Sequence, residues 1–493
     1  MALGNAWDEK SVWQVCIRLS TYLAEFWGST MRLLKSIPPL SLLLLAPAMA
    51  FGLGSQIPDQ DAAATARGDA FAATADNPSA IFYNPAGLTQ MPDGLSSRSG
   101  LYGIWANESY DPLHGQNGAH SSTAHEGLQT VPNFFLAYHP KGEAYTFGLG
   151  VYSPFGLKTE WPDDASFRKV GLYGSEEFIA INPTIAVQIT RTLSFGAGLS
   201  VNYIDAELRQ GLTSMEGDSF TFKGSALSLG GNAGLLWKPT DRQAIGLTYR
   251  SPVTADLSGH THEGLNGTER GEAEAGNAQI AAGEQRLEAG IAYIKSLPIP
   301  ASVKQAQIAQ ATAQYEAGLA EAGVPASGSF PTSFPTLGAD GTLRFPQSAV
   351  LAYSFRPTPD WNVETDINWT DWDSLNTVTL NRTDHSTVKV PFNWTHSLIY
   401  ELGVTHLVGP YKLSAGYMYS ENSVPSASFG PIVPDSTRNL LAFGVGRTFG
   451  KLTVDLAYQL ALGGTRTIVN DSLAEGRYSF LSNAVSISVG YHY

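Results

Sequence analysis

The sequence predicts an all-β fold: a transmembrane antiparallel β-barrel of about 14 strands, with an N-terminal hatch (a plug) inside it and a helical extracellular insertion. Three observations support this fold class. Apolar residues recur with period two, short turns alternate with long polar connections, and a broken apolar segment precedes the first strand.

The period-two pattern is clearest in the last segment of the chain. There the apolar residues Val485, Ile487, Val489, Tyr491 and Tyr493 alternate with small or polar residues. Because successive strand side chains point to opposite faces, such a segment has one apolar and one polar face. A soluble β-sandwich would show the same alternation, so this pattern does not decide between the two.

The connections between these segments are more informative. Short turns are expected at 140–143, 191–192, 238–242, 356–360, 409–410 and 450–451. Long polar connections are expected at 106–130, 154–176, 209–220, 258–342, 373–395, 421–437 and 463–481. Strict alternation of short and long connections is typical of an outer-membrane barrel, which has short periplasmic turns and long external loops. An array of this length would also leave open edges in water unless it closed into a barrel.

Two further features refine this barrel. Tyrosine and tryptophan residues near strand ends predict the aromatic girdles of a membrane barrel; these are Tyr102, Trp105, Trp237, Tyr249, Trp361, Trp369, Trp372, Tyr411 and Tyr419.

Pro183 interrupts the alternating run 179–189. Since proline cannot donate to a strand ladder, a bulge or a local break is expected there.

Composition excludes several classes of protein. The 493 residues carry 30 Lys+Arg against 44 Asp+Glu, a formal charge of -14, which leaves no basic surplus for nucleic-acid binding. The mean hydropathy of -0.08 is too polar for a helical membrane protein. Cys16 is the single cysteine, so no disulfide within the chain is expected.

The first fifty residues predict export. Residues 31–50 have the anatomy of a signal peptide: Met31, basic residues, an apolar run and a small-residue cleavage site at Ala48–Ala50. Translation is therefore expected to start at Met31, and the mature chain to begin near Phe51. Residues 1–30 would then be a mis-annotated upstream extension, with a genuine N-terminal extension as the alternative.

Residues 51–95 are expected to form the hatch, ahead of a barrel over 96–493. Its Asp76–Met91 stretch carries two Asn-Pro steps, the second continuing as Asn84-Pro85-Ala86-Gly87. A residue before proline is pushed out of the helical region, so each step forces a turn or a kink. A broken apolar segment of this kind is expected to sit inside the array that follows it.

The long connection 258–342 contains a second irregular segment. Residues 271–323 predict two amphipathic helical pieces separated at 297–300, where two prolines fall. They are expected either to form a helical hairpin over the barrel mouth or to be a surface insertion without function.

The chain resembles the FadL-type outer-membrane transporters of long-chain fatty acids, a family that includes aromatic-hydrocarbon channels. The resemblance covers about residues 52–493. It rests on the ordered motifs Asn84-Pro85-Ala86, Val131-Pro132-Asn133-Phe134, Trp369-Thr370-Asp371-Trp372 and Ser423-Val424-Pro425 with Ile432-Val433-Pro434-Asp435, and on the terminal Tyr493.

The resemblance implies a location, a route and a substrate. The protein would be a multi-pass protein of the bacterial outer membrane. Substrate would be captured at external loops, enter an apolar pocket and leave sideways into the membrane through a break in the third strand. The ligand would be a long-chain fatty acid, or alternatively a neutral aromatic or aliphatic hydrocarbon. The other expected partner is outer-membrane lipid, not nucleic acid, and a monomer is expected.

The same resemblance implies the site residues. The hatch or gate would be Asn84, Pro85, Ala86 and Gly87, and the third-strand break would involve Gly148, Gly150 and Pro154. Arg209 matches the family's basic residue at the upper end of the fifth strand, where it would hold the substrate carboxylate; otherwise it is a solvated charge. A second cation of the family is replaced here, with Thr395 nearby, which suits a neutral hydrocarbon equally well.

No catalytic residues, metal or cofactor are expected. His114, His120 and His125 beside Glu126 match no zinc-site spacing, and a solvated loop is the simpler interpretation. Glu364 and Asp366 share one strand face and are expected to pair with a cation such as Arg250 in the barrel lumen. A barrel-embedded lipid enzyme, a general porin and an adhesin are the remaining alternatives. The apolar plug argues against an open pore.

Overall fold

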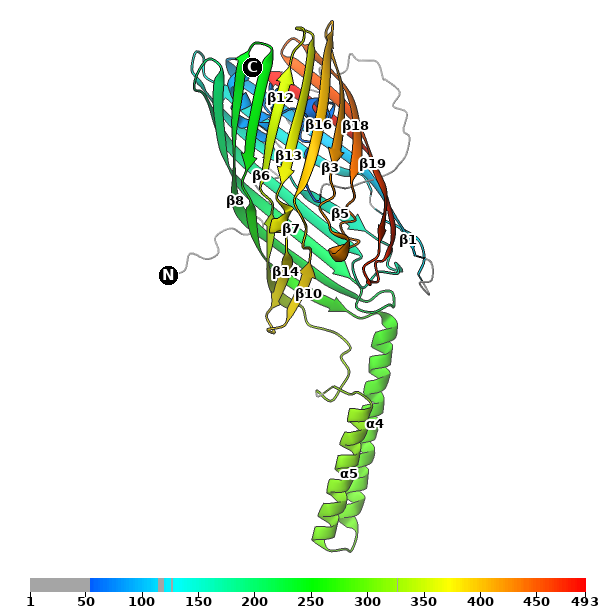
Figure 1. Ribbon diagram of the computed structural model, residues 1–493. Helices are drawn as coiled ribbons and strands as arrows, with labels where there is room; N and C mark the ends of the chain where they lie inside the picture. Colours follow the sequence, from blue (N-terminus) through cyan, green and yellow to red (C-terminus); the bar gives the residue numbers. More distant parts are fainter. Residues whose placement is uncertain (1–53, 114–118, 126, 326) are drawn as a thin grey trace, which may run out of the picture. The chain divides into compact units, whose positions relative to one another are not determined.

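The strands form one antiparallel sheet that closes on itself. The computed structural model describes residues 54–493 except 114–118, 126 and 326. The expected extension (1–30) and signal peptide (31–50), together with His114 and Glu126, therefore lie outside the described residues. The sheet closes between the first and last strands, where 96–112 pairs with 476–492. Figure 1 shows these strands wrapped around the N-terminal segment.

Twenty strand segments make up this sheet. They are β1 (Gly94–Pro112), β2 (Ser122–Thr123), β3 (Gln129–His139), β4 (Tyr145–Tyr152), β5 (Gly156–Glu160), β6 (Tyr173–Gln188), β7 (Leu193–Gln210), β8 (Ser219–Thr240), β9 (Gln243–Arg250), β10 (Val253–Gly264), β11 (Leu337–Phe345), β12 (Ser348–Phe355), β13 (Trp361–Thr370), β14 (Thr377–Arg382), β15 (Thr387–Pro391), β16 (Ser397–Val408), β17 (Tyr411–Ser420), β18 (Arg438–Phe449), β19 (Leu452–Ile468) and β20 (Gly476–His492).

Several neighbouring segments are two halves of one strand. The halves are β4 with β5, β9 with β10, β11 with β12, β13 with β14, and β15 with β16, while β2 is a short addition to β1. Counted in this way, the barrel has fourteen strands, and the predicted all-β barrel is confirmed. All six short turns fall where the sequence predicts them.

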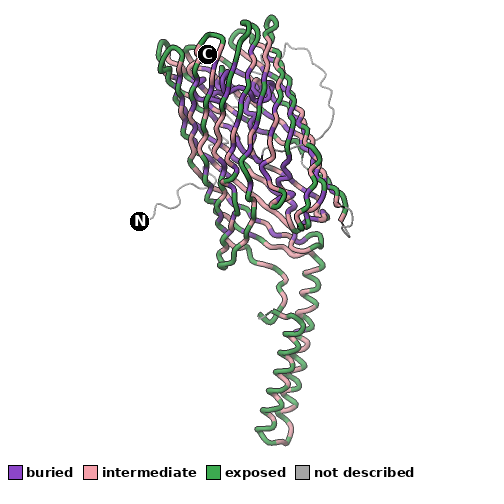
Figure 2. The backbone as a smooth tube through the Cα atoms, viewed as in Figure 1, coloured by how far each residue is buried: buried purple, intermediate pink, exposed green. Residues whose placement is uncertain are grey.

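The wall has an apolar outer face. Leu199 on β7 and Leu229 on β8 are 75% and 77% exposed, while the residues that flank Leu199 are buried or small. Figure 2 shows this alternation of buried and exposed residues along the strands. Large apolar side chains on the outer face match a wall that is surrounded by lipid.

The predicted girdle is wrong for two of its members. Trp237, Tyr249 and Trp361 are on the outer face and more than 40% exposed. Tyr102 and Trp372 are buried, at 2% and 1% exposed. Tyr102 shares the inner face of its strand and donates to Gln459, and Trp372 belongs to a 3-10 turn between β13 and β14, so both serve the interior.

Pro183 causes a local break rather than a bulge. The register of β6 with β7 is unchanged on either side, but Asn182 and Pro183 are missing from the ladder. The Nδ2 group of Asn182 donates to the main-chain oxygen of Leu199 at 2.9 Å. A side-chain amide thus replaces the N–H that proline lacks.

The remaining elements are helical: α2 (Ala62–Thr65), α3 (Ala80–Tyr83), η2 (Pro85–Gln90), α4 (Gly267–Ser296), α5 (Ala301–Glu321), η3 (Trp372–Ser374) and η4 (Ser426–Ser428). No helix in the described residues is long and apolar enough to cross a bilayer. The two helical pieces predicted within 271–323 are confirmed as α4 and α5.

The helical insertion is shorter than the predicted connection 258–342, because β10 continues to Gly264 and β11 begins at Leu337. Helix α4 starts with a capping box between Asn266 and Glu269. The two helices contact each other where the Tyr315 hydroxyl donates to the main-chain oxygen of Ile280 at 3.1 Å. Ile280 is buried, and no residue of α5 is. The helices are therefore mostly exposed rather than amphipathic as predicted.

Candidate functional site

The hatch, defined here as residues 54–93, is held by two acidic residues of β13. Glu364 accepts hydrogen bonds from the backbone N–H groups of Ala73 and Thr74 at 2.7 and 3.1 Å, and forms an ion pair with Arg67 at 2.9 Å. Asp366 accepts from the backbone N–H groups of the two preceding hatch residues at 3.1 and 3.0 Å. The prediction that these carboxylates pair with a cation is confirmed for Glu364, but the cation is Arg67 of the hatch, and the suggested partner Arg250 is wrong.

A second anchor ties the hatch to the seam of the barrel. Arg98 on β1 forms ion pairs with Asp61 of the hatch and with Asp455 on β19, the latter at 2.8 Å. Asp61 also caps α2 by accepting from the backbone of Ala63. All three charged side chains are buried, so each depends on the others for its charge balance.

The Asn-Pro-Ala turn packs directly on the barrel wall. The side chain of Asn84 caps η2 and donates to the main-chain oxygens of Ala72 and Leu235 at 2.7 and 3.1 Å. A Cβ at Gly196 or Gly234 would overlap the Asn84–Pro85 backbone or side chain. Within the hatch, a Cβ at Gly87 would overlap the backbone of Ala75. The turn therefore fits only a wall that carries glycine at these points.

Gly148 and Gly150 lie in the regular part of the third strand. Both are paired on each side, with β3 and with β6. A Cβ at either position would come within 2.9 Å of the hatch residue Ile81. These glycines therefore make room for a hatch side chain.

The third strand is interrupted three residues beyond Gly150. It is broken at residues 153–155, between β4 and β5, and Pro154 lies in this gap. The N-terminal part of the hatch fills part of it: Ile57 N–H donates to the Pro154 oxygen at 2.9 Å, and Gly156 N–H donates to the Ser55 oxygen at 2.8 Å. On the other side, β3 pairs with β4 only from Phe134 onward.

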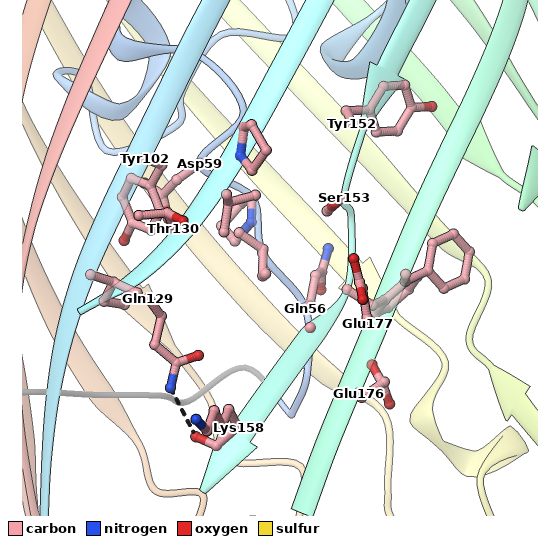
Figure 3. A pocket seen from close by; sticks show the side chains of 18 of the residues that line it. Gln56, Asp59, Tyr102, Gln129, Thr130, Tyr152, Ser153, Lys158, Glu176 and Glu177 are labelled. Carbon is pink, nitrogen blue, oxygen red and sulfur yellow. Dashed lines mark hydrogen bonds between the residues drawn. The ribbon is translucent and has the colours of Figure 1, made fainter. Parts of the chain in front are cut away.

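A cavity of about 460 Å³ opens at this interruption; we call it the third-strand cavity. Figure 3 shows Gln129 and Thr130 on one side and Ser153 and Glu177 on the other, with Gln56 of the hatch between them. Gln129 reaches across to the main-chain oxygen of Lys158 at 3.3 Å. The volume lies within the range of about 300–1,000 Å³ that is usual for small-molecule sites.

A smaller cavity of about 100 Å³, the apolar cavity, lies next to it. Most of its lining is apolar or aromatic, including Leu208, Phe222, Leu257, Leu380 and Trp394. Aromatic rings separate the two cavities. Phe155 and Phe178 line the third-strand cavity, and Phe345, whose ring centroid lies 5.0 and 4.8 Å from theirs, lines the apolar cavity.

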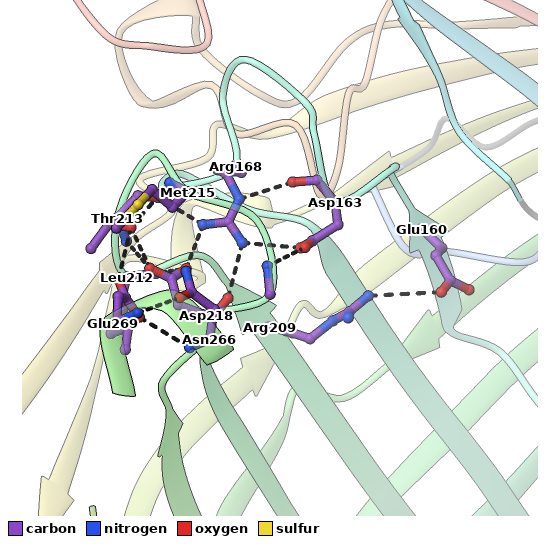
Figure 4. Close-up of polar contacts among 11 residues, drawn as sticks. Glu160, Asp163, Arg168, Arg209, Leu212, Thr213, Met215, Asp218, Asn266 and Glu269 are labelled. Carbon is purple, nitrogen blue, oxygen red and sulfur yellow. Dashed lines mark hydrogen bonds and ion pairs between the residues drawn. The ribbon is translucent and has the colours of Figure 1, made fainter. Parts of the chain in front are cut away.

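Arg209 lines neither of these two cavities. It is half-buried at the end of β7, 3.7 Å from Glu160 and 5.8 Å from the centroid of the Tyr173 ring. Figure 4 shows this pair beside a separate cluster around Arg168.

The Arg168 cluster ties three external segments together. Arg168 forms ion pairs with Asp163 and Asp218, and Thr213 joins Asp218 to Glu269 at the start of α4. Burial by itself would raise the pKa of Asp218, but hydrogen bonds from Thr213 and Arg168 lower it below its ordinary value.

No group of three or more metal-ligating side chains is present in the described parts of the chain. His120 and His125 are both exposed; His120 lies 3.4 Å from Asp164.

The hatch residues that occupy the gap in the third strand could not be predicted from the sequence. The Ser55–Gln60 segment has no motif of its own, and its contact with 153–156 spans almost a hundred residues. Glu176 was not predicted as a site residue either. The sequence did contain a signal, because Glu176 and Phe178 are two residues apart and therefore share one face of a strand, where a charged residue beside an aromatic one is unusual.

A closed fourteen-stranded barrel with an apolar outer face and an internal N-terminal segment is an outer-membrane protein. The chain belongs to the family of outer membrane transport proteins described as OMPP1/FadL/TodX, whose model matches residues 43–493.

Named relatives agree with this membership. A long-chain fatty acid transport protein of Salmonella typhi is 22% identical over 71% of this chain and 73% of its own length. One from Escherichia coli O6:H1 is 27% identical, but over only 28% of this chain and 36% of that protein. A putative outer membrane protein of Neisseria meningitidis is 26% identical over 46% of this chain and 56% of its own. The chain thus spans about a third to a half of several curated relatives that it matches.

Solved structures share the fold. A Pseudomonas aeruginosa FadL homologue superposes with a TM-score of 0.69 at 19% identity, covering 89% of this chain and 99% of that one. The P. putida toluene transporter TodX gives 0.58 at 17% identity, covering 85% and 94%.

Proposed function

We propose that this protein takes up long-chain fatty acids across the outer membrane. Substrate is captured among the external loops, enters the apolar cavity, passes into the third-strand cavity and leaves sideways between β3 and β5. The names of the curated relatives support the choice of substrate. The family consists of transport proteins, which supports a channel rather than a lipid enzyme.

One observation carries the sideways exit. The third-strand cavity is lined by residues 129–132 of β3, which have no strand partner on the side of β4, and by Gly156 and Lys158 of β5 across the interruption. A stretch of wall without strand pairing offers a passage from the lumen to the lipid that a continuous ladder would close.

The energetics favour such an exit. An acyl chain gains about 0.8 kcal/mol for each CH₂ that leaves water, so apolar surface is sufficient for binding. The demanding step is release. An opening in the wall lets the chain move from protein into lipid without re-entering water.

The hatch is the gate in this proposal. Its Ser55–Gln60 segment hydrogen-bonds to Pro154 within the interruption and to Gly156 at the start of β5. Movement of this segment would widen the opening, and the Asn84–Gly87 turn, which begins η2, would transmit that movement to the wall. Gly148 and Gly150 contribute by accommodating Ile81.

Neutral hydrocarbons are the second candidate substrates. The observation in their favour is that Arg209, the expected carboxylate ligand, is paired with Glu160 and lies outside both cavities. In the fatty-acid proposal, Arg209 then acts as an external first contact. The toluene transporter among the similar folds makes the alternative worth testing.

A reversible cross-link across the gap tests the exit. Gln129→Cys and Lys158→Cys would be bridged by a bifunctional methanethiosulfonate, in a chain with Cys16→Ser if that residue is retained. Oleate uptake by cells or proteoliposomes should fall about tenfold or more and recover on reduction.

The control is the pair Thr448→Cys and Thr453→Cys, whose parent hydroxyls lie 3.1 Å apart on the intact β18–β19 ladder. Cross-linking this pair should leave uptake unchanged. Undiminished uptake with a verified bridge between residues 129 and 158 would refute the sideways exit. Uptake of toluene but not oleate would instead establish the second candidate.

A further inference from the structure

Glu176 lies between the third-strand cavity and the apolar cavity. Among the residues that the structure describes, it alone lines both the third-strand cavity and the apolar cavity. It shares the inner face of β6 with Phe178, whose ring helps to separate the cavities. A substrate that passes from one cavity to the other therefore passes the Glu176 carboxyl group.

This carboxyl group is incompletely satisfied by the protein. Ser55 of the hatch interacts with it, but its Oε1 atom is buried and has no hydrogen-bond partner among the described residues. No lysine or arginine of the described chain forms an ion pair with it; Arg209 and Lys223, nearby on β7 and β8, pair with Glu160 and Glu207 instead. Leaving a buried acceptor unpaired is costly, and such groups are normally paired.

We propose that Glu176 recognises a hydrogen-bond donor on the substrate as it crosses between the cavities. The inference rests on the proposed route and specifies its substrate class. The preferred ligands are long-chain amphiphiles that carry an O–H or N–H group, rather than bare hydrocarbons. A fatty acid meets this requirement as the acid, whose O–H donates to Oε1.

Three ligands of one chain length separate the head group from the chain. Oleyl alcohol offers a donor, methyl oleate offers only acceptors, and 1-octadecene offers neither. Binding to the purified, detergent-exchanged protein should be about tenfold tighter for the alcohol than for the ester, since an unpaired buried acceptor carries a penalty that only the alcohol removes.

Variants at Glu176 and at one control position test its role. Glu176→Leu should reduce the alcohol-to-ester ratio to about one without weakening octadecene binding. Glu176→Gln keeps an acceptor oxygen at nearly the same place and should preserve the preference. Asp340→Leu is the matched control, because it removes an exposed carboxylate of β11 that lines neither cavity. Heat-modifiable gel mobility checks that each variant has a folded barrel.

The outcomes are distinct. An unchanged alcohol-to-ester ratio in a folded Glu176→Leu protein overturns the inference and leaves the proposed transport intact. Equal loss in the Glu176→Leu and Asp340→Leu variants also overturns it. Failure of the unmodified protein to bind any of the three ligands overturns the proposed function, and the role of Glu176 falls with it.

Discussion

Arg250 on β9 donates a hydrogen bond to the hydroxyl of Tyr152, the last residue of β4, at 3.0 Å. The same guanidinium donates to the main-chain oxygen of the hatch residue Phe82 at 3.1 Å and lies 4.6 Å from the centroid of its ring. One side chain thus joins the wall, the hatch and the lip of the interrupted third strand.

We expect Arg250→Met to loosen the hatch near Phe82. Hydrogen bonds to charged groups contribute about 1.5–3 kcal/mol, so amide exchange in the 80–84 segment should accelerate about tenfold or more. Tyr152→Phe removes only the hydroxyl and should have a smaller effect. Exchange that is unchanged in the Arg250→Met protein would show that this link does not hold the hatch.

Glu364 is expected to be a main anchor of the hatch. Glu364→Ala leaves Arg67 buried without its partner and two backbone N–H groups without an acceptor, a loss of about 3–5 kcal/mol for the ion pair alone. Ion conductance in planar bilayers should rise as the hatch detaches. Glu364→Gln keeps an acceptor and should conduct less. The control Glu421→Ala removes a carboxylate that accepts from Leu398 on the wall, and should stay closed.

Arg209→Ala should have a limited effect on binding. Its guanidinium is half-buried and already paired with Glu160, and exposed ion pairs contribute only about 0–1 kcal/mol. Oleate affinity should fall less than about threefold, and affinity for oleyl alcohol should not change. A larger loss, confined to oleate, would make Arg209 the carboxylate ligand after all.

The external Arg168 cluster should respond to acid. The folded-state pKa of Asp218 is lowered, so its contribution is present above its ordinary value of about 3.9 and is lost as pH falls through the lower folded value. A spin label at Met215→Cys should therefore be immobile at neutral pH and gain mobility below about pH 4. Asp218→Asn should be mobile throughout; an immobile label in that variant would exclude this role for Asp218.

The membrane part of this fold could be predicted because its signals are local. Alternation sets each strand, and Gly, Pro and polar clusters set each turn, as at 409–410 between β16 and β17. The strand ends were underestimated for a related reason. The segments β5, β14 and β15 lie within expected connections, because an alternation only 5 or 6 residues long is a weak local signal.

The contacts between the hatch and the barrel wall could not be predicted from local patterns. Glu364 and Arg67 are separated by 297 residues. Glu364 also accepts hydrogen bonds from backbone N–H groups, which every residue except proline has and which therefore leave no signal in the sequence. The sequence favoured Arg250 as partner by charge alone, whereas that arginine is used at Tyr152 and Phe82. Only the three-dimensional closure of the wall around the hatch brings these groups together.

The seam between β1 and β20 has a consequence for biogenesis. The hatch precedes β1 in the chain, yet its anchors lie on β13 in mid-barrel and, through Arg98 and Asp455, on both sides of the seam. Asp455 belongs to β19, the penultimate strand. The hatch, which is synthesised before any barrel strand, therefore completes its contacts only when the last strands arrive, and insertion of the C-terminal hairpin and docking of the hatch become one cooperative step of assembly.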